Sequence, residues 1–298
     1  MGAMPADPPS PLAAQPLHID GVELRVAPLG GYEVSDHLVL VKSVEVLDAY
    51  RDVLSAYDRP SIVEIGIAYG GSVAFFALTA DPSRLVAIEM AAERVVLLDR
   101  LIEERGLGER VHLHYGVDQG DRGRVGEIVA SEFGGTPIDL VIDDGSHLYD
   151  ETVASFETLF PHLRPGGEYI IEDWSCDHGI RALLTAALAD PGSPVHAWAQ
   201  QIVAGEIPSA HDDQQPQSAV AVASLGLAGD GPAVGRPPLS RLAARFVLAA
   251  AEPGSGIESV TAGPYWLSVR RASDDVERDT FSLDAACPDN FGTLTPGT

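Results

Sequence analysis

The stretch SIVEIGIAYGGS, residues 61–72, decides the fold class. It is a short run of mostly β-branched residues that ends in a glycine-rich turn, and such a strand followed by a helical pattern begins a βαβ unit. Four further runs of this kind follow in chain order: Arg84–Glu89, Arg110–Tyr115, Ile138–Asp143 and Gly167–Glu172.

Helical patterns separate these runs, and they lie at Ala91–Arg105, Asp121–Phe133 and Tyr149–Leu163. Strands that alternate with helices at this pitch predict an α/β protein whose parallel sheet is covered on both faces. Right-handed crossovers then make the sheet doubly wound and Rossmann-like.

The alternation breaks after the fifth run. A short helix is expected at His178–Ala189, and a helical stretch returns at Leu239–Ala251. Two alternating runs, Ile257–Ala262 and Tyr265–Arg271, are separated by a Gly-Pro pair. They predict a late antiparallel hairpin.

Composition divides the chain into three parts. Residues 1–16 are rich in Pro and small residues and are expected to form a flexible tail, and 17–57 are expected to form an N-terminal helical or capping segment. Residues 58–298 form the α/β domain. The part of it at about 190–238 is rich in Pro, Gly, Ser, Asp and Gln, and an insertion of that length predicts a lid or a substrate-binding segment.

The charge balance restricts the partners. Acidic side chains number 44 and basic ones 19, which gives a net charge of −25 and disfavours nucleic acid or an anionic membrane surface. Two cysteines, Cys176 and Cys287, are too few for a disulfide framework. With neither a signal-peptide pattern nor an apolar run of about 18 residues, a cytoplasmic location is expected.

The glycine-rich turn is a candidate ligand site. Gly66 and Gly70 let a ligand approach the backbone, and the following helix offers free N–H groups. The dinucleotide fingerprint is absent because residue 68 is Ala68. Glu64 at the strand end would repel a pyrophosphate and suits a cationic or amino-bearing ligand, whereas Glu89, at the end of the second run, is placed to accept hydrogen bonds from ribose hydroxyls.

Asp118 follows the third run at the same edge of the predicted sheet. Two interpretations stay open for it. It binds an exocyclic amine such as that of adenine, or it caps the helix that starts near Gly120.

Acidic residues end two successive strands. Asp144 follows the fourth run, and Glu172 and Asp173 end the fifth. If these strands are neighbours, about 4.8 Å apart, the three carboxylates meet at the mouth of the sheet. Because like charges repel, the cluster predicts a bound cation, and ligands that are all oxygen favour Mg²⁺.

His147 lies three residues beyond Asp144. Its imidazole titrates near neutral pH, so it can take a proton from a hydroxyl whose pKa a metal has lowered. A lone histidine is often structural, but the loop position at the mouth of the site favours function here. Asp143 is expected to orient its neighbours or to cap the loop.

Together these motifs resemble a known family, the metal-dependent class I S-adenosylmethionine O-methyltransferases, and within it the sugar methyltransferases of the macrocin and mycinamicin type. The resemblance covers about residues 58–175. The motifs that carry it are Glu64-x-Gly66, Gly70-Gly71-Ser72, Glu89, Asp143-Asp144-Gly145-Ser146-His147, Pro165-Gly166-Gly167 and Glu172-Asp173.

The resemblance implies a class I methyltransferase sheet and two cofactors, S-adenosylmethionine and Mg²⁺. It implies metal binding by Asp144, Glu172 and Asp173 and catalysis by His147 as general base together with Asp144. The residues expected to bind S-adenosylmethionine are Glu64, Gly66, Tyr69, Gly70, Ser72, Glu89, Asp118 and Asp143.

The expected function is methylation of a sugar hydroxyl that chelates the metal with its neighbour. The acceptor is a small molecule or an oligosaccharide: a deoxysugar of a secondary metabolite, or a hexose such as mannose in a polysaccharide precursor. The alternatives are a phenol or catechol acceptor, and a non-catalytic cofactor-binding partner subunit. A homo-oligomer is also expected, and the amphipathic segments Val44–Leu54 and Leu239–Leu248 either serve it or pack into the core.

Overall fold

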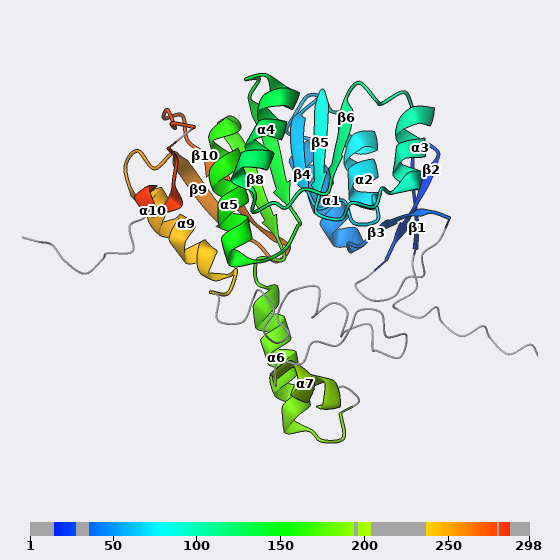
Figure 1. Ribbon diagram of the computed structural model, residues 1–298, viewed down its shortest axis with the longest axis vertical. Coiled ribbons are helices and arrows are strands. Elements are labelled where there is room, and N and C mark those ends of the chain that lie inside the picture. The colour runs from blue at the N-terminus through cyan, green and yellow to red at the C-terminus, as the bar shows by residue number, and fades with distance from the viewer. Residues whose placement is uncertain (1–14, 28–35, 194–195, 204–236, 279, 287–298) are drawn as a thin grey trace, which may run out of the picture.

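A seven-stranded sheet lies at the centre of the protein (Figure 1). Its strands are β4 (Ser61–Ile65), β5 (Arg84–Glu89), β6 (Val111–Tyr115), β7 (Ile138–Asp143), β8 (Leu163–Glu172), β9 (Ile257–Ala262) and β10 (Trp266–Arg271). The computed structural model describes residues 15–27, 36–193, 196–203, 237–278 and 280–286.

The strand order is β6-β5-β4-β7-β8-β10-β9. β4 to β8 pair in parallel, β10 runs antiparallel to β8, and β9 runs antiparallel to β10. This confirms the predicted doubly wound sheet with a late antiparallel hairpin. Chain order reverses between β4 and β7, and open α/β sheets bind their ligands at the carboxyl ends of the strands at such a switch point.

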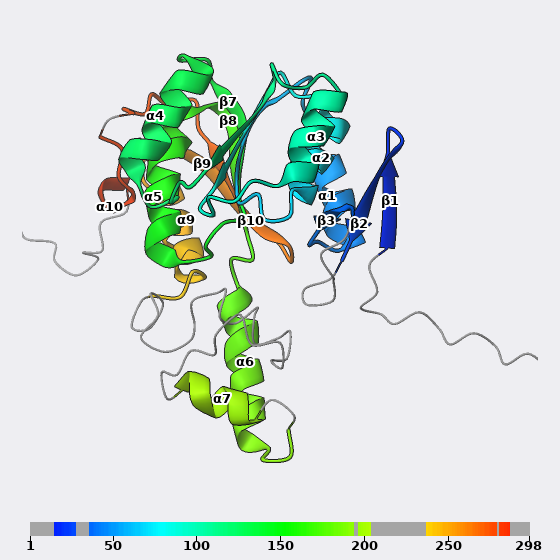
Figure 2. The same ribbon diagram turned by 45° about the vertical axis from the view of Figure 1, so that its right-hand side comes forward.

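Helices cover both faces of the sheet (Figure 2). One layer contains α1 (Val44–Leu54), α2 (Gly71–Ala80) and α3 (Val96–Glu104); the other contains α4 (Arg122–Phe133), α5 (Tyr149–Leu159) and α9 (Arg241–Ala251).

Side chains alternate along the buried strand β4, so the two faces of the sheet form separate hydrophobic cores. Ile62 packs in the core that contains Phe75 of α2, and Val63 packs in the core that contains Phe156 and Phe246 of α5 and α9. Glu64 shares the α1–α2 face with Ile62.

The apolar faces of α1 and α9 are used inside the molecule. Leu47 and Tyr50 of α1, and Leu242 and Phe246 of α9, are all buried in these cores. The two segments therefore pack as core helices. The expected homo-oligomer stays a prediction, and these two helices no longer support it.

Two helices extend away from the layers, α6 (Cys176–Ala189) and α7 (His196–Val203) (Figure 1). α7 belongs to the insertion expected at about 190–238, most of which lies outside the described residues, and its role as a lid stays a prediction. None of the described helices is both long and apolar enough to span a membrane.

The N-terminal segment differs from the helical segment expected at 17–57. A small sheet of β1 (Gln15–Ile19), β2 (Val22–Val26) and β3 (Leu38–Leu40) precedes α1. Asp20 and Gly21 join β1 to β2 with φ angles of 48° and 75°, and an Asp-Gly pair is a strong hairpin signal that the sequence analysis overlooked. The expected tail lies outside the described residues except for Gln15 and Pro16, which begin β1, and the division of the chain into domains stays a prediction.

The bounds of two helices differ from the predicted ones. The helix expected to end at Leu163 ends at Leu159, because a 3-10 turn, Phe160–His162, and an early start of β8 follow it. The helix expected from Ala91 begins at Val96. Apart from the early start of β8, the other elements for which a range was predicted begin and end within two residues of it. The short helix α10 (Leu283–Ala286) was not predicted.

Candidate active site

The glycine-rich loop after β4 packs tightly against the end of β7. Gly66 has φ of 98°, and a Cβ atom added to it would lie 2.2 Å from the carbonyl oxygen of Asp144. The Asp144 N–H donates to the carbonyl of Ile65 at 2.9 Å. Gly66 is therefore required for the approach of the two strand ends, in addition to any contact with a ligand.

The loop continues into α2. Gly70, with φ of 79°, occupies the N-cap position, where no side chain caps the first N–H groups of α2. Ser72 is half-buried in that first turn, and the Tyr69 side chain is partly exposed before it. An uncapped helix start beside a glycine loop offers donors to a ligand.

Glu64 is the most unusual residue of the site. It is fully buried, and neither carboxylate oxygen has a hydrogen-bond partner among the described residues. Burial raises the pKa of Glu64 to about 8, although Ser72 and the Lys42 ammonium oppose the shift. A buried, unpartnered carboxylate costs free energy that a cationic ligand would recover.

Glu89 holds the same loop from the end of β5. Its Oε2 accepts hydrogen bonds from the N–H groups of Ile67 at 2.9 Å and Ala68 at 3.0 Å, and its Oε1 accepts one from Ala91 at 2.8 Å. These bonds shape the loop, and the contact with a ribose stays a prediction.

Asp118 is exposed and makes a local turn, in which its Oδ1 accepts from the Gly120 N–H at 2.8 Å. The capping interpretation is wrong in detail, because α4 begins at Arg122 and is capped by Asp121, which accepts from the Arg124 N–H. The contact of Asp118 with an adenine amine stays a prediction.

Asp143 is buried in a network on the α5 face of the sheet. It accepts hydrogen bonds from the hydroxyls of Tyr169 and Ser155, both at 2.7 Å, and from the amide of Gln119 at 3.2 Å. Burial raises the pKa of Asp143, and these donors oppose the shift. Gln119 also accepts from the Ser146 N–H at 2.6 Å. Asp143 thus orients, through Gln119, the loop that follows β7, and the contact of Asp143 with the cofactor stays a prediction.

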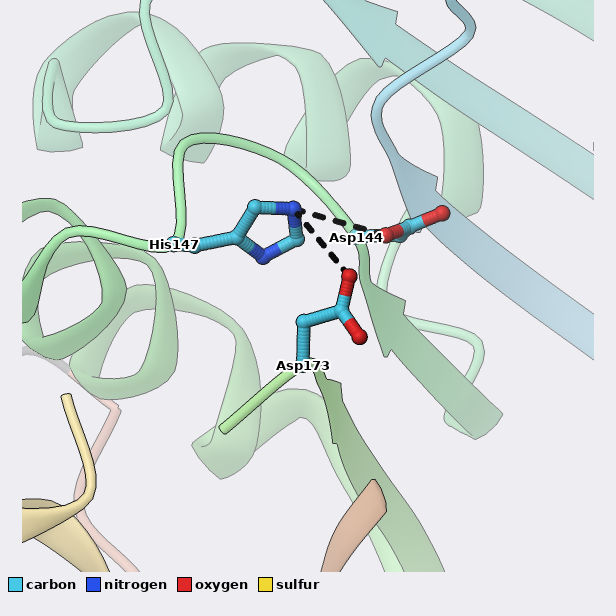
Figure 3. Close-up of side chains that lie close together, drawn as sticks. All are labelled: Asp144, His147 and Asp173. Atoms are coloured by element: carbon cyan, nitrogen blue, oxygen red, sulfur yellow. Dashed lines mark ion pairs between the residues drawn. The ribbon is translucent and has the colours of Figure 1, made fainter. Parts of the chain in front are cut away.

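Asp144, His147 and Asp173 converge at the ends of β7 and β8 (Figure 3). His147 Nε2 lies 3.7 Å from Asp144 Oδ1 and 3.9 Å from Asp173 Oδ2. One ligand atom from each residue lies within 4.8 Å of the others, an arrangement that can hold a metal ion.

The backbone at this cluster is strained. His147 and Asp173 have φ angles of 54° and 49°, in the left-handed region that few residues other than glycine adopt. Such conformations concentrate at functional sites, where the surrounding structure maintains them.

Glu172 turns toward a residue that the sequence analysis did not select. Its two carboxylate oxygens accept from the Lys42 ammonium at 2.6 and 2.7 Å, and the Tyr50 hydroxyl donates to Oε1 at 2.7 Å. The same ammonium donates to Asp144 Oδ2 at 2.7 Å. Asp144 therefore lies near Asp173 on one side, and Lys42 lies between Asp144 and Glu172 on the other. Glu172 is outside the group of ligand atoms formed by Asp144, His147 and Asp173, and its binding of a metal stays a prediction.

Charge in this cluster is balanced by Lys42. Burial and the neighbouring Asp144 raise the pKa of Glu172, while Lys42 and Tyr50 oppose the shift. Burial alone would lower the pKa of Lys42, but the two carboxylates raise it above its ordinary value. Lys42 is thus a buried cation, and its being the single lysine of the chain was the one signal that pointed to it.

Residues 63–174 match a family described as a methyltransferase domain. Demethylmacrocin O-methyltransferase of Streptomyces fradiae is 54% identical over 56 residues, which are 19% of this chain and 13% of that protein. Mycinamicin VI 2''-O-methyltransferase of Micromonospora griseorubida is 56% identical over 45 residues, 15% of this chain and 11% of that protein.

Among solved structures, the MycE methyltransferase from the mycinamycin biosynthetic pathway, in complex with Mg, SAH and mycinamycin VI, aligns with a TM-score of 0.46 and 20% identity. The alignment covers 83% of this chain and 52% of that one. The chain thus spans about half the length of this protein, and the curated matches are shorter still.

The family match and the curated relatives confirm the resemblance that the motifs carry. Residues 63–174, which match the methyltransferase-domain family, contain the glycine-rich loop, the acidic strand ends and His147. The curated relatives are O-methyltransferases of the macrocin and mycinamicin type.

Proposed function

We propose that this protein is an S-adenosylmethionine-dependent and Mg²⁺-dependent O-methyltransferase whose acceptor is a sugar hydroxyl of a secondary metabolite. The observation that carries the proposal is the buried carboxylate of Glu64, which has no hydrogen-bond partner among the described residues and lies beside the glycine-rich loop of the matched methyltransferase segment.

The residues present fit the cofactor. The amino group of S-adenosylmethionine is a cation that would satisfy the orphaned oxygens of Glu64. Glu89 and Asp118 would hold the ribose and adenine, and the remaining residues proposed for the cofactor are Gly66, Tyr69, Gly70, Ser72 and Asp143. When bound, the cofactor supplies an electrophilic methyl group.

The residues also fit a hard divalent ion. Asp144, Glu172 and Asp173 would hold Mg²⁺ through oxygen atoms, which this ion prefers. A bound ion would lower the pKa of an acceptor hydroxyl and would fix the position of that hydroxyl.

His147 would take the proton of that hydroxyl at Nε2, the atom that faces Asp144 and Asp173. The left-handed backbone at His147 holds the imidazole toward them, so orientation of the base contributes to the rate.

The sugar acceptor is proposed from the relatives, whose names specify demethylmacrocin and mycinamicin VI. A net charge of −25 is compatible with a neutral acceptor. A cytoplasmic location and a homo-oligomer belong to the same proposal.

A mass-spectrometric acceptor screen tests the proposal. The protein is incubated with Mg²⁺ and trideuteromethyl-labelled S-adenosylmethionine against macrolides with deoxysugars, simple hexosides and catechols. We expect one labelled methyl group on a deoxysugar, loss of the product with EDTA and its return with excess Mg²⁺. Methylation of catechols alone would reassign the acceptor, and tight cofactor binding without transfer would favour a non-catalytic subunit.

A further inference from the structure

Lys42 reaches the acidic cluster from outside the matched methyltransferase domain. It lies between β3 and the N-cap of α1, and its side chain is 4% exposed. The tight contact between β3 and α2 fixes this segment, because a Cβ on Gly71 would lie 2.2 Å from the carbonyl oxygen of Val39. The N-terminal segment therefore delivers one positive charge to the ends of β7 and β8.

A purely structural ion pair does not explain this position. Burying a lysine and a glutamate costs desolvation that their attraction often fails to recover, and apolar packing would serve stability as well. The Lys42 ammonium donates to two carboxylates, those of Asp144 and Glu172. The position of Lys42 is explained by these two carboxylates, which it neutralises.

Lys42 and a divalent ion would use the same carboxylates. Asp144 turns Oδ2 to the ammonium at 2.7 Å and Oδ1 toward His147 at 3.7 Å. Glu172 turns both oxygens to the ammonium. An ion that enters from the side of His147 and Asp173 thus meets a cation already bound to two of its three proposed ligands.

We propose that Lys42 is a tethered cation that competes with the divalent ion for Asp144 and Glu172 and thereby sets how tightly that ion binds. The proposal rests on the proposed function, since it needs the ion. Two consequences follow. The carboxylates stay oriented and neutralised while no ion is bound, and the ion binds weakly enough to exchange, because like charges in close contact repel.

Calorimetric titration of Mg²⁺ and Mn²⁺ into the full-length protein tests this. Lys42→Gln keeps hydrogen-bonding capacity and removes the charge. Arg124→Gln is the matched control, since this cation lies on α4 and pairs with Glu127. We expect Lys42→Gln to bind both ions at least about tenfold more tightly than wild type, with no change for Arg124→Gln.

The outcomes separate the two proposals. An equal or weaker affinity in Lys42→Gln overturns the role of Lys42, and ion-dependent methyl transfer by wild type would then leave the proposed function intact. Absence of ion binding to both proteins overturns the role of Lys42 together with the proposed ion site.

A second measurement needs no variant. With a single lysine, ¹³C-lysine labelling gives one set of side-chain signals in an NMR spectrum, and all of them report Lys42. We expect these signals to shift as Mg²⁺ is added, because the ammonium loses or shares its carboxylates. Signals that stay unchanged while calorimetry shows Mg²⁺ bound would overturn the proposal.

Discussion

Glu64 places stability and function in conflict. Its carboxyl group is buried with no hydrogen-bond partner in the part of the chain that the structure describes, and burial raises its pKa from 4.5 to about 8. The folded protein therefore holds this proton more tightly than the unfolded chain, and the free energy of unfolding falls as pH rises through that window. The charge is tolerated in the fold because, on our account, the cofactor amine pairs with it.

Glu64→Gln is expected to have two opposite effects. Without cofactor at about pH 9, the free energy of unfolding should rise by roughly 2–4 kcal/mol over wild type, since no buried charge forms. At about pH 5 the difference should nearly vanish. Binding of S-adenosylmethionine, measured by calorimetry, should weaken by at least about tenfold.

Urea unfolding at both pH values checks the first effect. A variant less stable than wild type at high pH would show that Glu64 has a structural partner, which contradicts the account.

His147 carries the proton-transfer step of the proposal. We expect His147→Ala to lower kcat by about 10²–10⁴-fold, the usual contribution of a general base, and to leave cofactor affinity unchanged. His18→Ala, on the exposed side of β1, is the control and should leave both unchanged. Turnover that survives His147→Ala removes the assignment of the base.

At this scale the proximity of Asp144, His147 and Asp173 was predictable from the sequence, because these residues lie at or after strand ends that a parallel sheet brings together. Lys42 and Tyr50 could not be found in this way. They lie more than one hundred residues from Glu172 along the chain, and only the packing of the N-terminal segment brings them near. The contact of Gln119 with Asp143 was missed as well, although only 24 residues separate them in the chain.

At the scale of elements, the contact between β3 and the start of α2 determines whether Lys42 reaches the site. Gly71→Ala should lower the free energy of unfolding by about 1–3 kcal/mol, because its Cβ would meet the backbone of β3 at 2.2 Å. Gly126→Ala in α4 is the matched helical control. Its Cβ makes an ordinary contact at 3.9 Å, so it should be neutral or stabilise by up to about 1 kcal/mol.

Urea unfolding of both variants measures the difference. Equal stabilities would contradict the close packing of β3 on α2.

Most elements were predictable because parallel strands buried on both faces read as continuous apolar runs, as in β4, β5 and β7. The first hairpin was missed, although Asp20 and Gly21 form a strong turn signal, because the short strands around them alternate polar and apolar residues and lie in a segment read as helical. The end of α5 was placed late because the apolar pattern continues through the 3-10 turn into β8.

At the scale of the whole molecule, the order of strands matters most. β4, β7 and β8 are neighbours although other elements separate them in the chain. This topology gathers the glycine-rich loop, Asp144 and Asp173 at one edge, while the N-terminal segment adds Lys42 from the α1 face.

The fold should therefore be stable without a bound ion. We expect EDTA to abolish methyl transfer while shifting Tm by no more than a few degrees, because Lys42 neutralises Asp144 and Glu172 when no ion is present. Thermal unfolding followed by circular dichroism, with Lys42→Gln beside wild type, measures this. A large loss of Tm in wild type on chelation would show that the ion, and not Lys42, holds the cluster together.

Binding of S-adenosylmethionine to the wild-type protein, followed by isothermal titration calorimetry, tests the central claim most directly. We expect saturable binding of one cofactor per chain, since the glycine-rich loop and the buried carboxylate of Glu64 are proposed to form its site. Absence of any binding at millimolar cofactor to the folded protein would contradict it.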